Sequence, residues 1–111
     1  LVTEKPAPVR MRSVAARIDP ETGVLRVLVA GLEPEDAQVR SAELWVVPEG
    51  GQPLSLGLIP GDGRVERDLT VREKALLVAG ATMAVTFEDR EGAPHNAPTG
   101  DILVAAPLAE I

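Results

Sequence analysis

The sequence has no cysteine and no tyrosine, and its 111 residues include one tryptophan, one phenylalanine and one histidine. The absence of cysteine excludes disulfide bonds and thiolate metal sites. Because Trp45 and Phe87 are the only aromatic residues, the core has to be built from aliphatic side chains. The large anchors that dominate most binding hot spots are scarce, which argues against a sugar-stacking or peptide-gripping surface.

Long hydrophobic runs are also missing, since no stretch approaches the roughly 18 to 20 apolar residues of a membrane-spanning helix. The chain begins at Leu1 without an initiator methionine or a signal peptide, so we expect it to be a piece of a longer protein. Residues 1–8 are rich in proline and lack periodicity, which predicts a linker. Residues 9–111 are then predicted to form one domain.

The formal net charge is −6, and an acidic surface repels phosphate backbones, so direct nucleic-acid binding is not expected. The densest basic group consists of Arg10, Arg12 and Arg17. It falls in a segment of alternating polarity, where the ordinary interpretation is a solvated strand face.

Seven short runs have the alternation or continuous apolar character of β-strands and are separated by glycine and proline turns. They span residues 10–19, 24–30, 42–47, 54–59, 65–69, 82–88 and 102–106. The run 24–30 is almost continuously apolar, which is typical of a central strand. The Gly-rich turns at 50–51 and 61–63 are predicted to close hairpins. Because helical crossovers are missing, the pattern predicts an all-β protein, an antiparallel immunoglobulin-like β-sandwich of about seven strands with one short helix.

That helix is predicted from a capping box in which Thr70 is followed three residues later by Glu73. It should run for about two turns, and Gly80 is placed to end it. Trp45 is expected to be a core anchor, with a place on a partner-binding surface as the alternative.

No catalytic constellation is evident. The only histidine, His95, is expected to be isolated and exposed in a polar loop. The only serines are Ser13, Ser41 and Ser55; none lies in a nucleophile elbow, and Ser55 is expected on an outward strand face. A serine triad through His95 would depend on an accident of the fold, since geometry defines a triad.

Carboxylates cluster at residues 33, 35 and 36 and again at 88, 89 and 91. Paired carboxylates can hydrolyse glycosides or bind calcium, but aromatic platforms and an Asp-rich calcium loop are both missing. Solvated acidic loops are the expected outcome. We therefore predict no enzyme activity, no catalytic, cofactor-binding or metal-binding residues, and no cofactor.

Six segments together resemble a known family. They are Glu-Leu-Trp at 43–45, the turn 48–51, Pro-Leu-Ser-Leu-Gly at 53–57, Ala-Gly-Ala-Thr-Met-Ala-Val-Thr at 79–86, the loop with Glu88, Gly92 and Pro94, and Pro-Thr-Gly-Asp-Ile-Leu at 98–103. In order and spacing they are similar to the extracytoplasmic C-terminal domain of anti-sigma-K factors. The resemblance covers residues 9–108, nearly the whole chain.

The resemblance implies a parent protein with a cytoplasmic domain that sequesters an extracytoplasmic-function sigma factor, followed by one transmembrane helix. This domain would lie on the periplasmic or cell-wall side as a sensory and regulatory domain, and residues 1–8 would be the juxtamembrane linker. Signal-dependent proteolysis would release the sigma factor, with a protease or an envelope signal protein as the domain's partner. The membrane would be reached only through the absent helix. The alternative is a secreted β-sandwich that binds a cell-envelope ligand.

Overall fold

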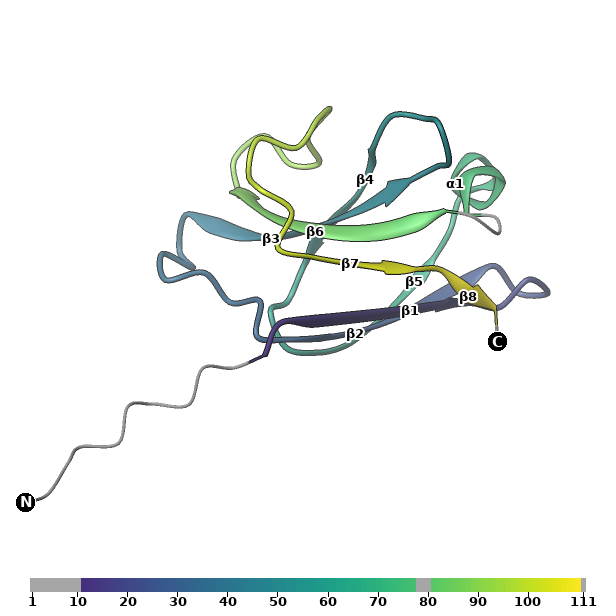
Figure 1. Ribbon diagram of the computed structural model, residues 1–111, viewed down its shortest axis with the longest axis horizontal. Helices are drawn as coiled ribbons and strands as arrows, with labels where there is room; N and C mark the ends of the chain where they lie inside the picture. Colours follow the sequence, from purple (N-terminus) through teal and green to yellow (C-terminus); the bar gives the residue numbers. More distant parts are fainter. Residues whose placement is uncertain (1–10, 78–80, 111) are drawn as a thin grey trace, which may run out of the picture.

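The computed structural model describes residues 11–77 and 81–110, which build two β-sheets packed face to face (Figure 1). The strands are β1 (Ser13–Ile18), β2 (Val24–Ala30), β3 (Arg40–Val47), β4 (Leu54–Ile59), β5 (Gly63–Asp68), β6 (Thr82–Asp89), β7 (Val104–Pro107) and β8 (Ala109–Glu110). The first sheet has the order β5-β2-β1-β8 and the second the order β4-β3-β6-β7. All pairings are antiparallel except β1 with β8. The predicted β-sandwich is confirmed.

Alternation of side chains places the aliphatic core between the sheets. In β1 the inward residues are Val14, Ala16 and Ile18, as predicted, and all three are buried. β2 lies inside its sheet, between β5 and β1, as predicted, but only one of its two faces is buried. Its outward residues Arg26 and Leu28 are exposed, because the outer face of the first sheet meets solvent.

In the second sheet the two central strands, β3 and β6, are buried on both faces. The inward residues of β3 are Ala42, Leu44 and Val46, which join the hydrophobic core. The intervening Glu43 and Trp45 point to the opposite face and are also buried. That outer face is covered by residues 90–103, the segment between β6 and β7, which folds back over β6 (Figure 1).

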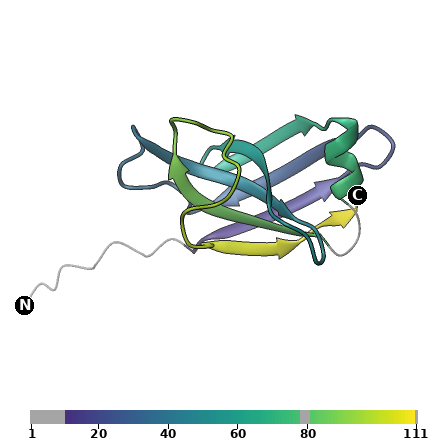
Figure 2. The same ribbon diagram turned by 90° about the horizontal axis from the view of Figure 1, so that it is seen from above.

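Four connections carry the chain from one sheet to the other: β2 to β3, β4 to β5, β5 to β6 and β7 to β8. The turn at 50–51 joins the paired strands β3 and β4 and is a hairpin, as predicted. The turn at 60–62 joins β4 to β5, which lie in different sheets, so the predicted hairpin at 61–63 is wrong. Near the end of the chain, β7 of the second sheet runs beside β1 of the first sheet (Figure 2). The chain then crosses to the first sheet, where β8 pairs with β1. This two-residue strand was not predicted.

The short helix α1 (Val71–Leu76) begins with the predicted capping box. The Thr70 hydroxyl accepts from the Glu73 amide at 3.1 Å, and the Glu73 carboxylate accepts from the Thr70 amide at 3.0 Å. The helix has six residues, close to the two turns predicted, and ends at Leu76 with Leu77 as its C-cap, before the predicted end. Gly80, the predicted end, lies outside the described residues.

Candidate functional site

A fully buried carboxylate lies on the outer face of the second sheet. Glu43 sits in β3 opposite Thr86 of β6, and its side chain is 0% exposed. Its carboxylate accepts hydrogen bonds from the Ser55 hydroxyl at 2.5 Å and from the His95 backbone amide at 3.0 Å. Its Oε1 also lies 2.5 Å from Nδ1 of His95. A charge removed from water needs such partners, and Glu43 has three of them.

His95 is therefore neither isolated nor fully exposed, and the prediction made for it is wrong. Its side chain is only 19% exposed. Its Nδ1 faces the Glu43 carboxylate, while its Nε2 lies 3.2 Å from the carbonyl oxygen of Glu91. Both neighbours are acceptors, and an imidazole can donate from both nitrogens only when it is protonated. The hydrogen bond to Glu43 accordingly raises the pKa of His95 above its ordinary value of 6.5.

A second buried carboxylate, Glu88 of β6, was expected in a solvated loop but is only 1% exposed. It accepts from the hydroxyl of Thr86 at 2.6 Å, from the hydroxyl and amide of Thr99 at 2.5 and 3.0 Å, and from the amide of Gly100 at 3.1 Å. Burial alone would raise the pKa of Glu88. These hydrogen bonds together outweigh that effect and hold the pKa below the ordinary value of 4.5.

Trp45 joins this arrangement through its indole. Nε1 donates to the Thr86 hydroxyl at 2.9 Å, and that hydroxyl donates onward to Glu88. At 1% exposure Trp45 is the buried anchor that the sequence predicted. Trp45 is not part of the aliphatic cluster between the two sheets. It is buried on the outer face of the second sheet, under the covering segment.

These contacts form two neighbouring hydrogen-bonded groups, which together we call the loop-docking network. Glu43 joins Ser55 and His95 in one group. Thr86 and Glu88 join Trp45, Thr99 and Gly100 in the other, and the two groups meet because Glu43 and Thr86 lie opposite each other in β3 and β6. Its members are Glu43, Trp45, Ser55, Thr86, Glu88, His95, Thr99 and Gly100. The first five come from strands of the second sheet, and the last three from the segment that covers it. The network therefore fixes the middle and the end of that segment to the sheet.

Gly100 shows how closely the segment approaches the sheet. A Cβ atom added at this position would lie 2.7 Å from the carbonyl oxygen of Phe87. Only glycine allows this approach without a shift of backbone. Its amide can then reach the Glu88 carboxylate.

The geometry of the network differs from that of a serine triad. In a triad the imidazole lies between the hydroxyl and the carboxylate and takes the proton of the hydroxyl. Here the Glu43 carboxylate lies between Ser55 and His95, and the hydroxyl donates to the carboxylate. The other imidazole nitrogen faces the Glu91 carbonyl. The arrangement can hold a loop and bind a proton, and it does not place the imidazole next to Ser55.

The remaining candidate residues are spread over the molecule. Ser13 is exposed at the start of β1, and Ser41 is buried and donates to the Ile59 carbonyl at 3.3 Å. The acidic residues 33, 35 and 36 are exposed, as expected, and so are Asp89 and Glu91. Arg12 and Arg17 are exposed as predicted, whereas Arg10 lies outside the described residues. Among residues 11–77 and 81–110 no group of three or more acidic or histidine side chains could hold a metal ion.

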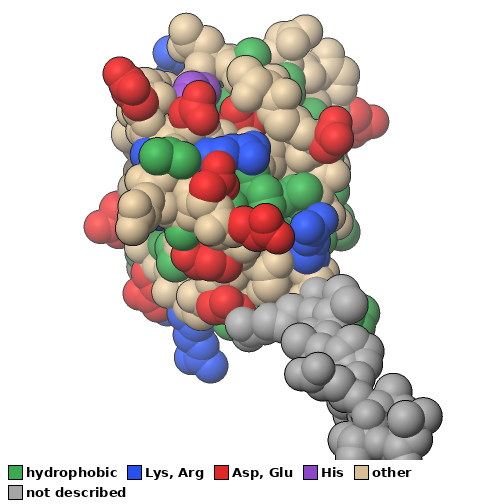
Figure 3. Space-filling model, turned by 90° about the vertical axis from the view of Figure 1, so that its left-hand side faces the viewer, with side chains coloured by type: hydrophobic (Ala, Val, Ile, Leu, Met, Phe, Trp, Pro, Cys, Tyr) green, Lys and Arg blue, Asp and Glu red, His purple; other side chains and the backbone are tan. Residues whose placement is uncertain are grey.

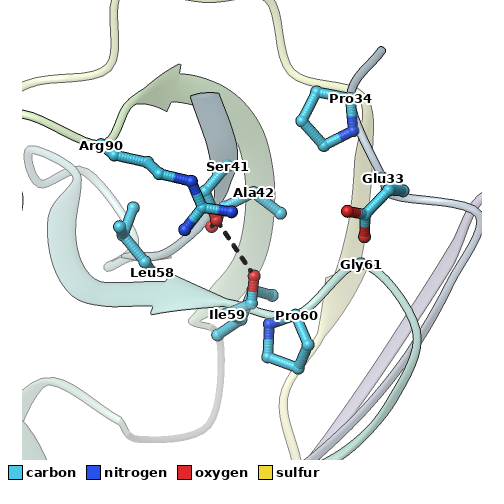
Figure 4. A pocket seen from close by; sticks show the side chains of 9 residues that line it. All are labelled: Glu33, Pro34, Ser41, Ala42, Leu58, Ile59, Pro60, Gly61 and Arg90. Carbon is cyan, nitrogen blue, oxygen red and sulfur yellow. Dashed lines mark hydrogen bonds between the residues drawn. The ribbon is translucent and has the colours of Figure 1, made fainter. Parts of the chain in front are cut away.

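A cavity of about 420 Å³ lies at the end of the sandwich where β2 and β6 finish. This end of the molecule carries a small group of apolar side chains among acidic and basic ones (Figure 3). The cavity is lined by Glu33, Pro34, Ser41, Ala42, Leu58, Ile59, Pro60, Gly61 and Arg90 (Figure 4). It contains none of the eight residues of the loop-docking network.

Within the described part of the chain, no helix is long and apolar enough to cross a membrane. The model of one protein family, described as "Anti-sigma-K factor rskA, C-terminal", matches residues 2–102. Neither the curated proteins nor the solved structures gave a match. Seven of the eight network residues lie in the segments that carried the resemblance in the sequence, and His95 is the one addition that the structure makes.

Proposed function

The chain belongs to the family of anti-sigma-K factor C-terminal domains, and we propose that it is the extracytoplasmic regulatory domain of a membrane-anchored anti-sigma factor. The parent protein would hold an extracytoplasmic-function sigma factor in the cytoplasm and release it through regulated proteolysis. The observation that carries this proposal is the family match over residues 2–102.

The site geometry favours a regulatory role over a chemical one. The loop-docking network uses two buried carboxylates to hold a covering segment, and its serine donates to one of them and not to the imidazole. We propose that the domain has no catalytic function of its own. Its partners would then be a protease or an envelope signal protein, and the sigma factor would contact only the cytoplasmic part of the parent.

A shielding mechanism is compatible with the topology. The proposed linker, residues 1–8, leads into β1, and β1 lies inside the first sheet between β2 and β8. All six residues of β1 are paired with β2. Access of a protease to the linker would therefore depend on whether the sandwich is folded. A signal that loosens the sandwich would expose the linker and start the proteolytic release.

The direct experiment is to substitute Thr86→Val in the parent gene, with Thr86→Ser as the matched control. Thr86→Val removes the hydroxyl that joins Trp45 to Glu88, whereas Thr86→Ser keeps it. We expect Thr86→Val to raise sigma-dependent transcription and to shorten the lifetime of the intact anti-sigma factor. Unchanged transcription and lifetime with a measurably destabilised domain would overturn the proposal.

The shielding step has a separate test in vitro. The purified chain, including residues 1–8, is digested with a broad-specificity protease in buffer and in urea that unfolds the sandwich. We expect cleavage in the linker to accelerate on unfolding; equal rates would rule out shielding. Fractionation of cells tests the alternative function, because recovery of the parent protein from the culture medium would favour a secreted binding module.

A further inference from the structure

We propose that the cavity at the end of the sandwich binds a small zwitterion, with the ligand's carboxylate at Arg90 and its ammonium group at Glu33. The chemical class is a free amino acid or short peptide with small aliphatic side chains. This site is separate from the loop-docking network, and its ability to bind such a ligand does not depend on the proposed role in sigma-factor control.

The cavity is built by segments from both sheets. Glu33 and Pro34 come from the connection that leaves the first sheet after β2, while Ser41 and Leu58 come from β3 and β4 of the second sheet. Its volume of about 420 Å³ lies at the small end of the range for ligand pockets, roughly 300 to 1,000 Å³. A ligand of a few residues at most would fit.

Arg90 is held in place before any ligand arrives. Its Nε donates to the carbonyl oxygen of Ala37 at 2.7 Å, and its backbone amide donates to the carbonyl oxygen of Val39 at 2.9 Å. The guanidinium has four further N–H donors in a rigid planar fork, which matches the two oxygens of a carboxylate. Figure 4 shows the guanidinium reaching across the cavity beside Ser41.

Glu33 stands on the opposite wall, and its position is fixed by Gly61. The amide of Leu32 donates to the carbonyl oxygen of Gly61 at 3.0 Å. A Cβ atom at position 61 would lie 2.6 Å from the backbone nitrogen of Glu33, so the two connections touch backbone to backbone. Figure 4 shows the Glu33 carboxylate directed toward the space between the walls.

The charges of the cavity select the ligand. Arg90 and Glu33 face each other across the space, and neither takes part in an ion pair with another described residue. A simple anion would be repelled by Glu33 and by the net charge of −6. A simple cation would leave the positive charge of the Arg90 guanidinium without a partner. A molecule with both charges satisfies both walls, and the apolar lining residues Leu58 and Pro60 suit a small aliphatic side chain.

The test is calorimetric titration of the purified chain with alanine, dialanine and trialanine. Dialanine has few non-hydrogen atoms, so we expect a Kd on the order of 1 mM for the best of the three. N-acetyl-dialanine lacks the ammonium group, and dialanine amide lacks the carboxylate. Each should bind about tenfold more weakly than dialanine.

Two variants assign the binding to this cavity. Glu33→Gln and Arg90→Gln should each weaken dialanine binding about tenfold. Glu33 is exposed and its side chain makes no hydrogen bond with another described residue, so Glu33→Gln keeps the fold intact even if Arg90→Gln does not. Glu49→Gln and Arg72→Gln make the same charge changes at exposed positions elsewhere and should leave binding unchanged.

Absence of binding for all three probes would overturn the inference. So would equal binding of dialanine and its blocked forms, or binding that Glu33→Gln leaves unchanged. Because the experiment uses only the purified chain and small molecules, its failure would leave the proposed function in sigma-factor control untouched.

Discussion

Nδ1 of His95 lies 2.5 Å from Oε1 of Glu43, across 52 positions of the sequence. The carboxylate is fully buried in β3, and the histidine belongs to the segment that covers the second sheet. This contact therefore makes the docking at the middle of a long loop depend in part on the charge of one imidazole, while Glu88 holds the end of the loop. Because His95 is the only histidine in the chain, no other histidine can replace it.

The first prediction concerns the strength of this pair. We expect His95→Ala to lower the free energy of unfolding by about 2 to 3 kcal/mol, because it removes the cationic partner of a buried carboxylate. Glu43→Gln keeps the shape of the side chain and removes its charge. The double variant should cost less than the sum of the two single variants, since each breaks the same contact.

Urea unfolding followed by Trp45 fluorescence measures all four proteins of this cycle. Trp45 is the only tryptophan and is buried, so its emission reports on the covered face of the sheet. Strictly additive costs would mean that His95 and Glu43 do not interact in solution, contrary to their contact in the structure.

The second prediction is a loss of stability at alkaline pH. Hydrogen bonding to Glu43 raises the pKa of His95 above 6.5, so the folded state binds its proton more tightly than the unfolded chain does. The resulting stabilisation is fully present below about pH 6.5 and disappears as the pH rises through the folded pKa. We expect the free energy of unfolding to fall over this window.

This decline in the free energy of unfolding can be assigned to a single side chain. The chain has one histidine and no cysteine, so no other side chain has an ordinary pKa in this window. His95→Gln should therefore give a flat profile between about pH 6 and pH 8.5. An equally steep decline in His95→Gln would show that another group is responsible.

The third prediction concerns acid. The pKa of Glu88 is held below 4.5, so its contribution to stability is present above that value and is lost as the pH falls through the folded pKa. Glu88→Gln removes this titration and leaves an amide that cannot accept all the hydrogen bonds of the carboxylate. We expect a less stable protein at neutral pH and a shallower acid transition, both measured by urea unfolding at several pH values. An unchanged acid transition would show that Glu88 is not the titrating group.

The sequence predicted the sandwich well, because strand alternation and turn residues are local signals. It missed the network because its contacts join distant segments. Glu43 interrupts an otherwise apolar strand, and that interruption was the one available sign of a buried carboxylate. Nothing local distinguished His95 from an exposed loop residue, since its partner lies 52 positions away. Glu88 was read with its acidic neighbours, although strand alternation separates it from the exposed Asp89.

The fourth prediction separates the hydroxyl of Thr86 from its methyl group. Thr86→Val is nearly isosteric but leaves the buried Trp45 indole N–H without its acceptor. It also removes one of the donors to Oε2 of Glu88, which still accepts from the amides of Thr99 and Gly100. We expect a loss of about 2 kcal/mol in the free energy of unfolding. Thr86→Ser keeps the hydroxyl and should cost clearly less. If the two variants were equally unstable, packing of the methyl group would be the dominant contribution instead.

The fifth prediction concerns the solvent-facing side of the first sheet, where Arg17 and Arg26 stand directly opposite each other in β1 and β2. Like charges at opposed positions destabilise a sheet, and Arg26 already pairs with Glu66 of β5 at 3.3 Å. Arg17→Glu replaces repulsion by attraction at the same position. We expect a gain of about 0.2 to 1 kcal/mol in the free energy of unfolding at low salt, which added salt should reduce. Arg64→Glu, on the exposed face of β5, makes the same charge change opposite Leu28 instead of an arginine. It should give no such gain, because the effect depends on the register of β1 and β2 and not on net charge.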